Sequence, residues 1–221
     1  MTESTKELDL SKLRQDYKKS KLRRKDLTNE PHVLFQMWFS EAMNSSITEP
    51  NAMVLGTISD DAPRARTVLL KNFDRKGAVF YTNYRSKKAF DISTNNKVSL
   101  LFPWYKIERQ VIIIGKAEKI SRKESLEYFK SRPLESQIGA WVSEQSSIIE
   151  SRNVIEKKLE EIKFNFNRKD IPIPNFWGGF RVKPVEFEFW QGRENRLHDR
   201  FRYKLKENAQ HSSWEIDRLS P

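Results

Sequence analysis

The stretch AMVLGTISDDAPRARTVLLKNFDRKGAVFYT, residues 52–82, contains three strand-like runs that are separated by two short turn sequences. The runs, residues 52–59, 65–73 and 78–82, are rich in β-branched, aliphatic and aromatic residues that favour extended chain. The sequences DDAP and DRKG between them contain the Asp, Pro and Gly residues that favour tight turns. Connections this short join antiparallel strands, so the stretch predicts an antiparallel meander of three strands.

More strands follow this meander. VSLLFPW at residues 98–104 and RQVIIIGKAEKIS at residues 109–121 are interpreted as two of them, after a short helix at residues 86–93 with Ser86 as its N-cap. A re-entry at residues 176–180, a strand at 187–190 and a closing strand at 214–217 complete the pattern. Five strands in sequence predict a mainly β fold with helices, in which an antiparallel, Greek-key-like β-barrel forms the domain.

Three longer helices are predicted around this barrel. The first begins near Pro31 and should pack on the sheet, the second opens with the capping box Ser121 to Glu124, and the third begins near residue 151. The apolar stripe of the first is Val33, Leu34, Met37, Trp38 and Ala42, and that of the third is Ile155, Leu159, Ile162 and Phe166. Residues 1–28 are interpreted as a basic, partly mobile arm with a weak helical stretch at residues 8–17, and residues 29–221 as a single domain.

Composition excludes several functional classes. The chain has 221 residues and no cysteine, which excludes disulfides, thiolate catalysis and Cys-ligated metals. Its three histidines, His32, His198 and His211, lack a paired spacing, and no GxSxG motif is present, so neither a metal site nor hydrolytic chemistry is predicted. No apolar run is long enough for a membrane span, and the N-terminus lacks the apolar core of a signal peptide, which predicts a cytoplasmic protein without a membrane partner.

The positive charge favours anionic partners. The net charge is +11 and the isoelectric point is about 9.7, and residues 1–25 hold nine Lys or Arg against four Asp or Glu. The chain has seven glycines and neither a GxGxxG motif nor a Walker loop. A phosphate group would therefore be bound by side chains rather than by a glycine-lined backbone loop.

A dense polar segment, FEFWQGRENRLHDR at residues 187–200, begins as an aromatic strand and breaks at Gln191-Gly192. Arg196, His198 and Arg200 are spaced two apart, so an extended segment would point all three to one side. Taken alone, the pattern slightly favours an edge strand with a solvated basic face. Two guanidinium groups beside a Trp-containing strand favour instead an anionic, planar ligand.

Other polar residues could contribute to such a site. Lys87 and Lys88 lie in the first turn of a short helix, where cations are unfavourable unless an anion binds there. Tyr128, Arg132 and Ser136 are spaced four apart, and Ser136 continues the helical face of the other two if Pro133 merely kinks the helix. Each of these patterns also has a simpler explanation. Arg66 and Lys71 could be charges at the two rims of a barrel strand, and Tyr128 and Arg132 could belong to an ordinary amphipathic helix surface. Gln145-Ser146-Ser147 could be a simple polar loop.

Several further motifs lie in order along about residues 13–221, namely RTVLLK, VFYTN, SLLFPW, ERQV, GKAE, YFKSRP, SQIGAW, NFWGGFRV, FEFWQ and RLHDRF. In these motifs and their order the chain resembles the pyridoxamine (pyridoxine) 5'-phosphate oxidases. The resemblance implies a split β-barrel that binds flavin mononucleotide (FMN). It also implies a cytoplasmic homodimer with two flavins at the interface, and the oxidation of pyridoxamine or pyridoxine 5'-phosphate by dioxygen to pyridoxal 5'-phosphate and hydrogen peroxide.

The resemblance also implies roles for individual residues. The residues matching those that hold FMN are Arg66, Thr67, Val68, Leu69, Lys71, Tyr81, Thr82, Lys87, Lys88, Gln110, Gln145, Ser146, Trp190 and Arg200. Those matching substrate-phosphate ligands are Lys71, Tyr128, Arg132 and Ser136, and Arg196 and His198 match the catalytic residues over the pyridine ring. Arg14 and Tyr17 match arm residues that cover the site.

One departure from the family pattern concerns Lys87, which stands where an Arg is often found. Lys keeps the charge but loses the two-pronged contact with phosphate, so the sequence predicts at most weaker flavin retention there. Two alternative functions fit part of the pattern: another split-barrel flavin protein, such as a reductase or haem-handling relative, and a basic nucleic-acid-binding barrel. The second would require exposed aromatics among Lys and Arg on a sheet face, whereas most aromatics here lie in apolar strands, and no nucleic-acid partner is predicted.

Overall fold

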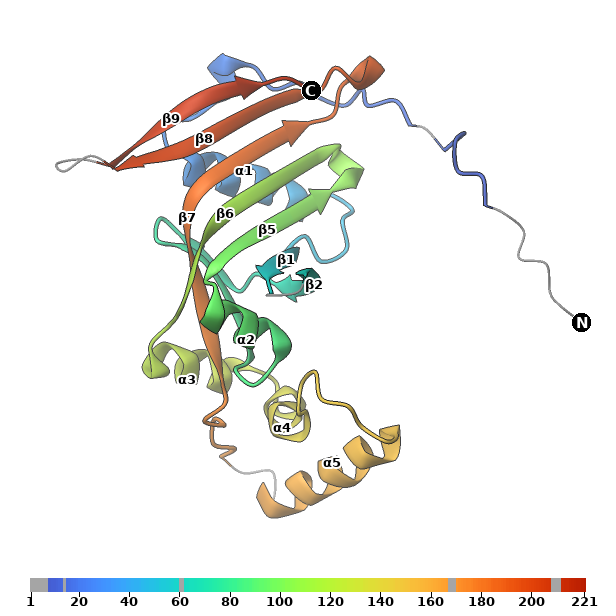
Figure 1. Ribbon diagram of the computed structural model, residues 1–221, viewed down its shortest axis with the longest axis vertical. Helices are drawn as coiled ribbons and strands as arrows, with labels where there is room; N and C mark the ends of the chain where they lie inside the picture. Colours follow the sequence, from blue (N-terminus) through green and yellow to red (C-terminus); the bar gives the residue numbers. More distant parts are fainter. Residues whose placement is uncertain (1–7, 14, 60–61, 167–169, 208–211) are drawn as a thin grey trace, which may run out of the picture.

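The computed structural model describes residues 8–13, 15–59, 62–166, 170–207 and 212–221. Their strands form a single antiparallel sheet that curls strongly (Figure 1). The strands are β1 (Ala52–Ile58), β2 (Pro63–Leu69), β3 (Asn72–Asp74), β4 (Gly77–Asn83), β5 (Lys97–Trp104), β6 (Arg109–Lys119), β7 (Trp177–Gln191), β8 (Asp199–Glu207) and β9 (Ser212–Leu219). The predicted mainly β, antiparallel barrel with added helices is confirmed.

The order of the strands corrects the predicted meander. The path through the sheet is β2-β1-β5-β6-β7-β4-β3, with β8 added to β7 and β9 to β8. The run at residues 65–73 is therefore two strands, β2 and β3, which lie at opposite ends of this path. The chain turns a corner between them: the Leu70 amide donates to Asn51 O, whereas the Lys71 amide donates to Val79 O in β4. This corner brings β2 back toward β4 and closes one side of a cavity.

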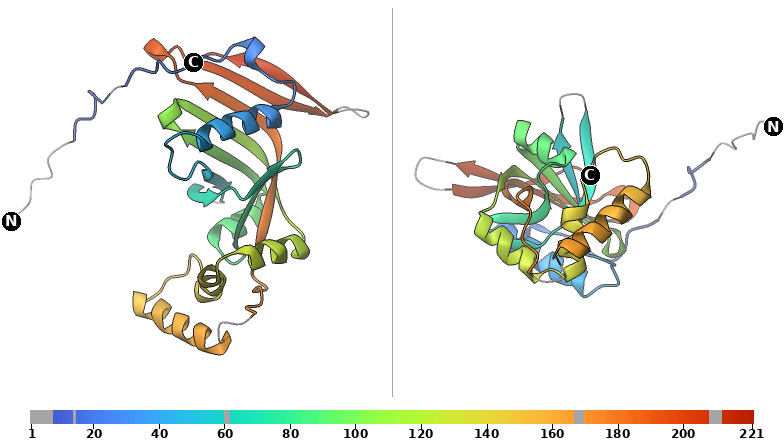
Figure 2. Two further views of the ribbon diagram at one scale, coloured as in Figure 1. Left: turned by 180° about the vertical axis from the view of Figure 1, so that it is seen from behind. Right: turned by 90° about the horizontal axis from the view of Figure 1, so that it is seen from below.

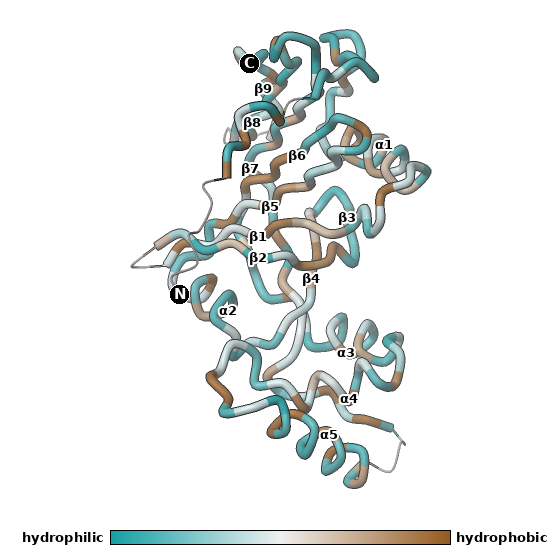
Figure 3. Tube along the Cα trace, turned by 90° about the vertical axis from the view of Figure 1, so that its right-hand side faces the viewer, coloured by the Kyte–Doolittle hydropathy of each residue, from teal (hydrophilic) through white to brown (hydrophobic). Residues whose placement is uncertain are grey.

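Helix α1 (Pro31–Met43) covers one face of the sheet, as predicted, and Pro31 is its first residue (Figure 2). Its buried stripe differs from the predicted one, because Val33 and Met37 are exposed whereas Phe35 is buried. Phe35 meets Phe102 and Phe73, and Trp38 meets Phe189 edge-on at 5.3 Å. Hydrophobic residues gather along the central strands under this helix, as the hydropathy colouring of Figure 3 shows.

Four further α-helices gather at the other end of the sheet: α2 (Lys87–Thr94), α3 (Arg122–Ser131), α4 (Leu134–Val142) and α5 (Arg152–Phe166). Helices α3, α4 and α5 contribute to a second, smaller hydrophobic cluster around Phe129, Ile138 and Trp177, whereas the buried apolar residues of α2 belong to the main core. The capping box at Ser121 and Glu124 is present. Ser86 does occupy the N-cap position of α2, but its hydroxyl donates to Asn83 O instead of capping the helix.

The N-terminal arm runs along the top of the sheet in Figure 1 from about residue 17 onward, whereas its earlier described residues extend away from the sheet without the predicted helical stretch. Among its described residues up to Tyr17, no helix forms, and the first helical turn is the 3-10 helix η1 (Arg24–Asp26). Leu22 is buried in the main core. No helix within the described part of the chain is long and apolar enough to cross a membrane.

Candidate active site

A cavity of about 1060 Å³ lies between β2, β4, α2 and the α3–α4 region. Its volume is at the upper end of the range for small-molecule sites. Most residues predicted to hold a cofactor or a phosphate line it. These are Arg66, Thr67, Val68, Leu69, Lys71, Tyr81, Thr82, Lys87, Lys88, Tyr128, Arg132, Ser136, Gln145 and Ser146.

The charged side chains in the described lining of this cavity are all positive. Six Lys or Arg side chains line it, and its lining contains no Asp or Glu in the part of the chain that the structure describes. The cations are Arg64, Arg66, Lys71, Lys87, Lys88 and Arg132. Cations that share a low-dielectric cavity repel one another, so a ligand with several negative charges would be strongly favoured there.

Lys88 is the most buried of these cations. Its Nζ atom donates to Gln145 Oε1 at 2.8 Å and to Thr82 Oγ1 at 3.2 Å, and no described carboxylate pairs with it. Burial, and after it the charge of Arg66, lowers the pKa of Lys88 from its usual value of 10.5 to about 8. The first turn of α2 therefore holds a cation whose charge a bound anion would stabilise.

Three stacked aromatic rings form another wall of the cavity. Tyr81 stacks on Tyr128 with ring centroids 3.9 Å apart, and Tyr81 stacks on Trp177 at 5.4 Å. Burial raises the pKa of Tyr81 to about 12, so its phenol keeps its proton at neutral pH.

Arg132 lies over the Trp177 ring at 4.7 Å, and its Nη1 atom is buried without a hydrogen-bond partner among the described residues. Burial lowers the pKa of this guanidinium. A buried donor without an acceptor is costly, and an anionic ligand would satisfy it.

The route by which Arg132 and Ser136 reach the cavity differs from the predicted one. Helix α3 ends at Ser131, Arg132 is its extended C-cap, and Ser136 belongs to the separate helix α4. Tyr128, Arg132 and Ser136 converge because the chain bends at Pro133, and not because one helical face continues.

The remaining predicted residues form a second patch at the other end of the molecule. Gln110 pairs with Trp190 in the sheet, and Trp190 pairs with Arg200, so the three form a row across β6, β7 and β8. Arg200 also binds Glu188 Oε1 at 2.9 Å. None of these residues lines the cavity, and Figure 1 shows β8 at the top of the molecule and α4 near the bottom.

The turn between β7 and β8 overturns the predicted extended geometry. Residues Glu194–Arg196 form the 3-10 helix η3, and both Asn195 and Arg196 have positive φ angles, 54° and 61°. Arg196, His198 and Arg200 therefore do not lie on one face of a strand. The turn instead folds His198 back over Trp190, with ring centroids 4.7 Å apart.

His198 is held by the backbone of this turn. Its Nδ1 atom accepts a hydrogen bond from the Arg193 amide at 3.1 Å. Burial lowers the pKa of His198, and the charges of Arg196 and Arg200 add to the effect. The neutral ring therefore carries its proton on Nε2, because Nδ1 serves as the acceptor.

Tyr17 connects the arm to this patch. Its ring meets Trp190 edge-on at 5.6 Å and His198 at 5.7 Å. A side chain at Gly192 would approach Tyr17 Cγ to 2.7 Å, so glycine leaves the space that this ring occupies. Arg14, the other arm residue predicted to cover the site, lies outside the described residues.

Two buried carboxylates that the sequence analysis missed fasten the arm beside Tyr17. The Lys19 amide donates to Glu108 Oε2 at 2.8 Å, and the Leu22 amide donates to Asp199 Oδ2 at 3.1 Å. Asp199 follows His198 directly, but nothing in its local sequence reveals a partner 177 residues away. The positive φ of Glu108, 57°, likewise has no local sequence signal.

Among the described residues, no group of three or more His, Cys, Asp or Glu side chains could hold a metal ion. The cavity and the patch thus contain basic, aromatic and hydroxyl groups. Such groups suit the binding of phosphates and planar rings.

Two protein-family models match the chain. The model described as pyridoxamine 5'-phosphate oxidase matches residues 39–166, and the model of the pyridoxine 5'-phosphate oxidase C-terminal dimerisation region matches residues 177–221. A curated protein of Prochlorococcus marinus (strain MIT 9303), named pyridoxine/pyridoxamine 5'-phosphate oxidase, is 52% identical to this chain over 214 residues. The match covers 96% of this chain and 96% of that protein.

Two solved structures resemble this one. PhzG from Burkholderia lata 383, solved in complex with tetrahydrophenazine-1-carboxylic acid, has a TM-score of 0.81 and 26% identity, over 89% of this chain and 95% of that one. A pyridoxamine 5'-phosphate oxidase-related, FMN binding protein from Nostoc punctiforme PCC 73102 has a TM-score of 0.68 and 16% identity, over 88% and 100% of the two chains. The second likeness supports the fold.

Replacing Lys88 with Met should stabilise the ligand-free protein at neutral pH. A lysine whose pKa falls to about 8 on folding lowers stability below that pH, and the loss disappears as pH rises toward 10.5. After allowing for the lost hydrogen bonds, we expect the free energy of unfolding at pH 7 to rise by about 1–2 kcal/mol in urea titrations. The gain should shrink by pH 10.

The exposed neighbour Lys87 provides the matched control, since Lys87→Met should change stability little. A Lys88→Met protein that is less stable than the unsubstituted chain at pH 7 would show that Lys88 is satisfied without an anion.

Proposed function

This chain belongs to the pyridoxamine 5'-phosphate oxidase family and is an FMN-dependent oxidase of vitamin B6 phosphates, and we propose that two copies of the chain assemble each active site. Its substrates are pyridoxamine and pyridoxine 5'-phosphate, and the product is pyridoxal 5'-phosphate. The observation that carries the site assignment is the cavity with six cations and no described carboxylate in its lining.

The cavity fits two phosphorylated ligands. The α2 side offers Arg66, Lys87 and Lys88, with Lys88 lacking any described carboxylate partner. The α3–α4 side offers Arg132, whose buried Nη1 atom has no described acceptor. We assign the phosphate of FMN to the first group, and the substrate phosphate to Arg132 with Tyr128, Ser136 and Lys71.

A second copy of the chain would complete each site. Gln110, Trp190, Arg196, His198 and Arg200 match family residues that contact the same two ligands, yet they lie outside the cavity of their own chain. Four of the five fall within residues 177–221, which match the family's C-terminal dimerisation region. Dimer formation would therefore bring the patch of one chain to the cavity of its partner.

A bound FMN would supply two-electron chemistry: it would take a hydride equivalent from the 4'-carbon of the substrate and return the electrons to dioxygen as hydrogen peroxide, and with the amine substrate water would release ammonia to leave the aldehyde. The residues of this chain supply binding and orientation. Arg132, Tyr128, Ser136 and Lys71 hold the substrate phosphate, which fixes the position of the pyridine ring and removes orientational freedom. Arg196 contributes its positive charge over that ring.

His198 acts as a hydrogen-bond donor in this arrangement. Its Nδ1 atom accepts from the Arg193 amide, so the proton of the neutral ring is on Nε2, the atom left for the substrate. The Trp190 ring packs against the imidazole at an interplanar angle of 47°. The lowered pKa keeps the ring neutral at pH 7, and protonation at acid pH would place a second N–H against the Arg193 amide.

An anaerobic titration tests the proposed activity. Adding pyridoxamine 5'-phosphate to the FMN-loaded protein should bleach the flavin absorption bands, and admitting air should restore them as pyridoxal 5'-phosphate forms. A protein that binds FMN without bleaching would contradict the substrate assignment and favour another split-barrel flavin enzyme. A protein that binds no FMN would overturn the cofactor site as well.

The donor role of His198 predicts different effects of two amide substitutions. Gln can place its N–H₂ group near the position of Nε2, so His198→Gln should keep kcat/KM within about tenfold of the unsubstituted enzyme. Asn reaches only the Nδ1 position, and His198→Asn should lose about 100-fold. Steady-state kinetics between pH 6 and 9 would measure both. If Nε2 works as a base, Gln and Asn should be equally damaging.

A further inference from the structure

Asp91 is a buried carboxylate just behind the cavity, and its ion pairs point to a role that the cavity lining alone does not reveal. It lies in α2, one helical turn after Lys88, and its side chain is almost completely buried. We propose that Asp91 is a positioning residue that holds Arg66 in place for the phosphate group of FMN. This proposal rests on the proposed function.

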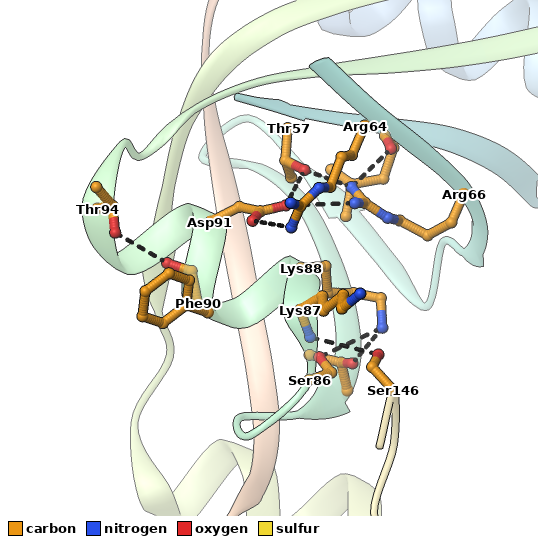
Figure 4. A network of polar contacts seen from close by, with 12 residues as sticks. Thr57, Arg64, Arg66, Ser86, Lys87, Lys88, Phe90, Asp91, Thr94 and Ser146 are labelled. Carbon is orange, nitrogen blue, oxygen red and sulfur yellow. Dashed lines mark hydrogen bonds and ion pairs between the residues drawn. The ribbon is translucent and has the colours of Figure 1, made fainter. Parts of the chain in front are cut away.

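The contacts of Asp91 reach across two strands (Figure 4). Its Oδ2 atom accepts from Thr57 Oγ1 at 2.6 Å and from Arg66 Nη2 at 3.4 Å. Its Oδ1 atom accepts from Arg64 Nη1 at 3.2 Å. One carboxylate thus links α2 to β1 and to two arginines of β2.

Arg66 is fixed from one side by this network. Its Nη1 atom donates to Thr57 Oγ1 at 2.6 Å and to Leu55 O at 3.2 Å, while Nη2 faces Asp91. Its Nε–H makes no hydrogen bond with any other described residue, and the side chain lines the cavity. Protein contacts therefore hold the Nη1 and Nη2 atoms of the guanidinium, and its Nε–H group remains available as a donor to a ligand.

A carboxylate beside Arg66 is electrostatically favourable in this site. Burial lowers the pKa of Arg66, whereas the charge of Asp91 acts in the opposite direction. Arg66 and Lys88 carry like charges and repel each other, and this repulsion adds to the effect of burial in lowering the pKa of Lys88. Asp91 offsets part of that repulsion without entering the cavity, where a carboxylate would repel phosphate.

This arrangement makes the effect of Asp91 specific to the phosphate group. FMN and riboflavin share the ring system and the ribityl chain and differ by the phosphate alone. If Asp91 acts through Arg66, its loss should weaken FMN binding and leave riboflavin binding unchanged. A general loss of folding would weaken both.

The test measures both dissociation constants for the full-length apoprotein by quenching of flavin fluorescence. For Asp91→Asn we expect FMN to bind about tenfold more weakly, the effect of losing an oriented charge-assisted hydrogen bond, and riboflavin to bind within about twofold of the original value. In an Arg66→Met background, Asp91→Asn should add almost nothing. Equal losses for the two flavins, or full additivity with Arg66→Met, would overturn the proposal.

Two further variants keep the test decisive. Thr57→Val removes the hydroxyl between Asp91 and Arg66 and should cause a smaller, phosphate-specific loss, even if Asp91→Asn folds poorly. Asp217→Asn removes another Arg–carboxylate pair, with Arg202 at 2.7 Å in the β8–β9 hairpin, and should leave FMN affinity unchanged. An unsubstituted protein that binds no FMN would refute the proposed function itself, whereas FMN binding that Asp91→Asn leaves intact would refute this inference alone.

Discussion

The concentration of positive charge in one cavity is the constraint on which the rest of this structure depends. Six cations line a space whose described lining contains no carboxylate, and burial opposes the charge on Arg66, Lys88 and Arg132. Other groups of the protein stabilise these three cations. Hydroxyl and amide oxygens accept hydrogen bonds from Lys88, the Trp177 ring packs against Arg132, and Asp91 forms an ion pair with Arg66. Asp91 offsets part of the charge on Arg64 and Arg66, and the positive charge of the described lining that remains favours two phosphorylated ligands.

The sheet keeps the positively charged cavity apart from the hydrophobic core. At the corner formed by Leu70 and Lys71, the chain leaves β2, which pairs with β1, and enters β3, which pairs with β4. As a result, β2 and β4 both face the cavity. The apolar faces of β5, β6 and β7 pack under α1. Because β7 continues as far as Gln191, the same sheet carries the Trp190 patch far from the cavity of its own chain.

Much of this fold could be predicted from local sequence, and the failures have physical reasons. Turn residues and apolar runs identified most strands, and the box at Ser121 and Glu124 identified the start of α3. The corner at Leu70 was missed because it depends on hydrogen bonds to Asn51 and Val79, and no turn residue marks it. The 3-10 turn at Arg196 was missed because periodicity describes regular strands and not positive φ angles.

The residues that line the cavity were predictable as a set and not as an arrangement. Motif resemblance identified the cavity side chains, but Asp91 gave no signal, because a single Asp in a short helix looks like any solvated residue. Nor could spacing along one chain reveal that the residues divide between a cavity and a distant patch. That division is the basis for the proposed site shared by two chains.

Co-expression of two defective variants tests the shared site most directly. Arg132→Ala damages the cavity and Arg196→Ala damages the patch, so a mixed dimer would carry both defects in one site and neither in the other. Random mixing should then restore about a quarter of the unsubstituted activity, well above that of either variant alone. Activity no higher than the average of the two variants would contradict an active site assembled from two chains.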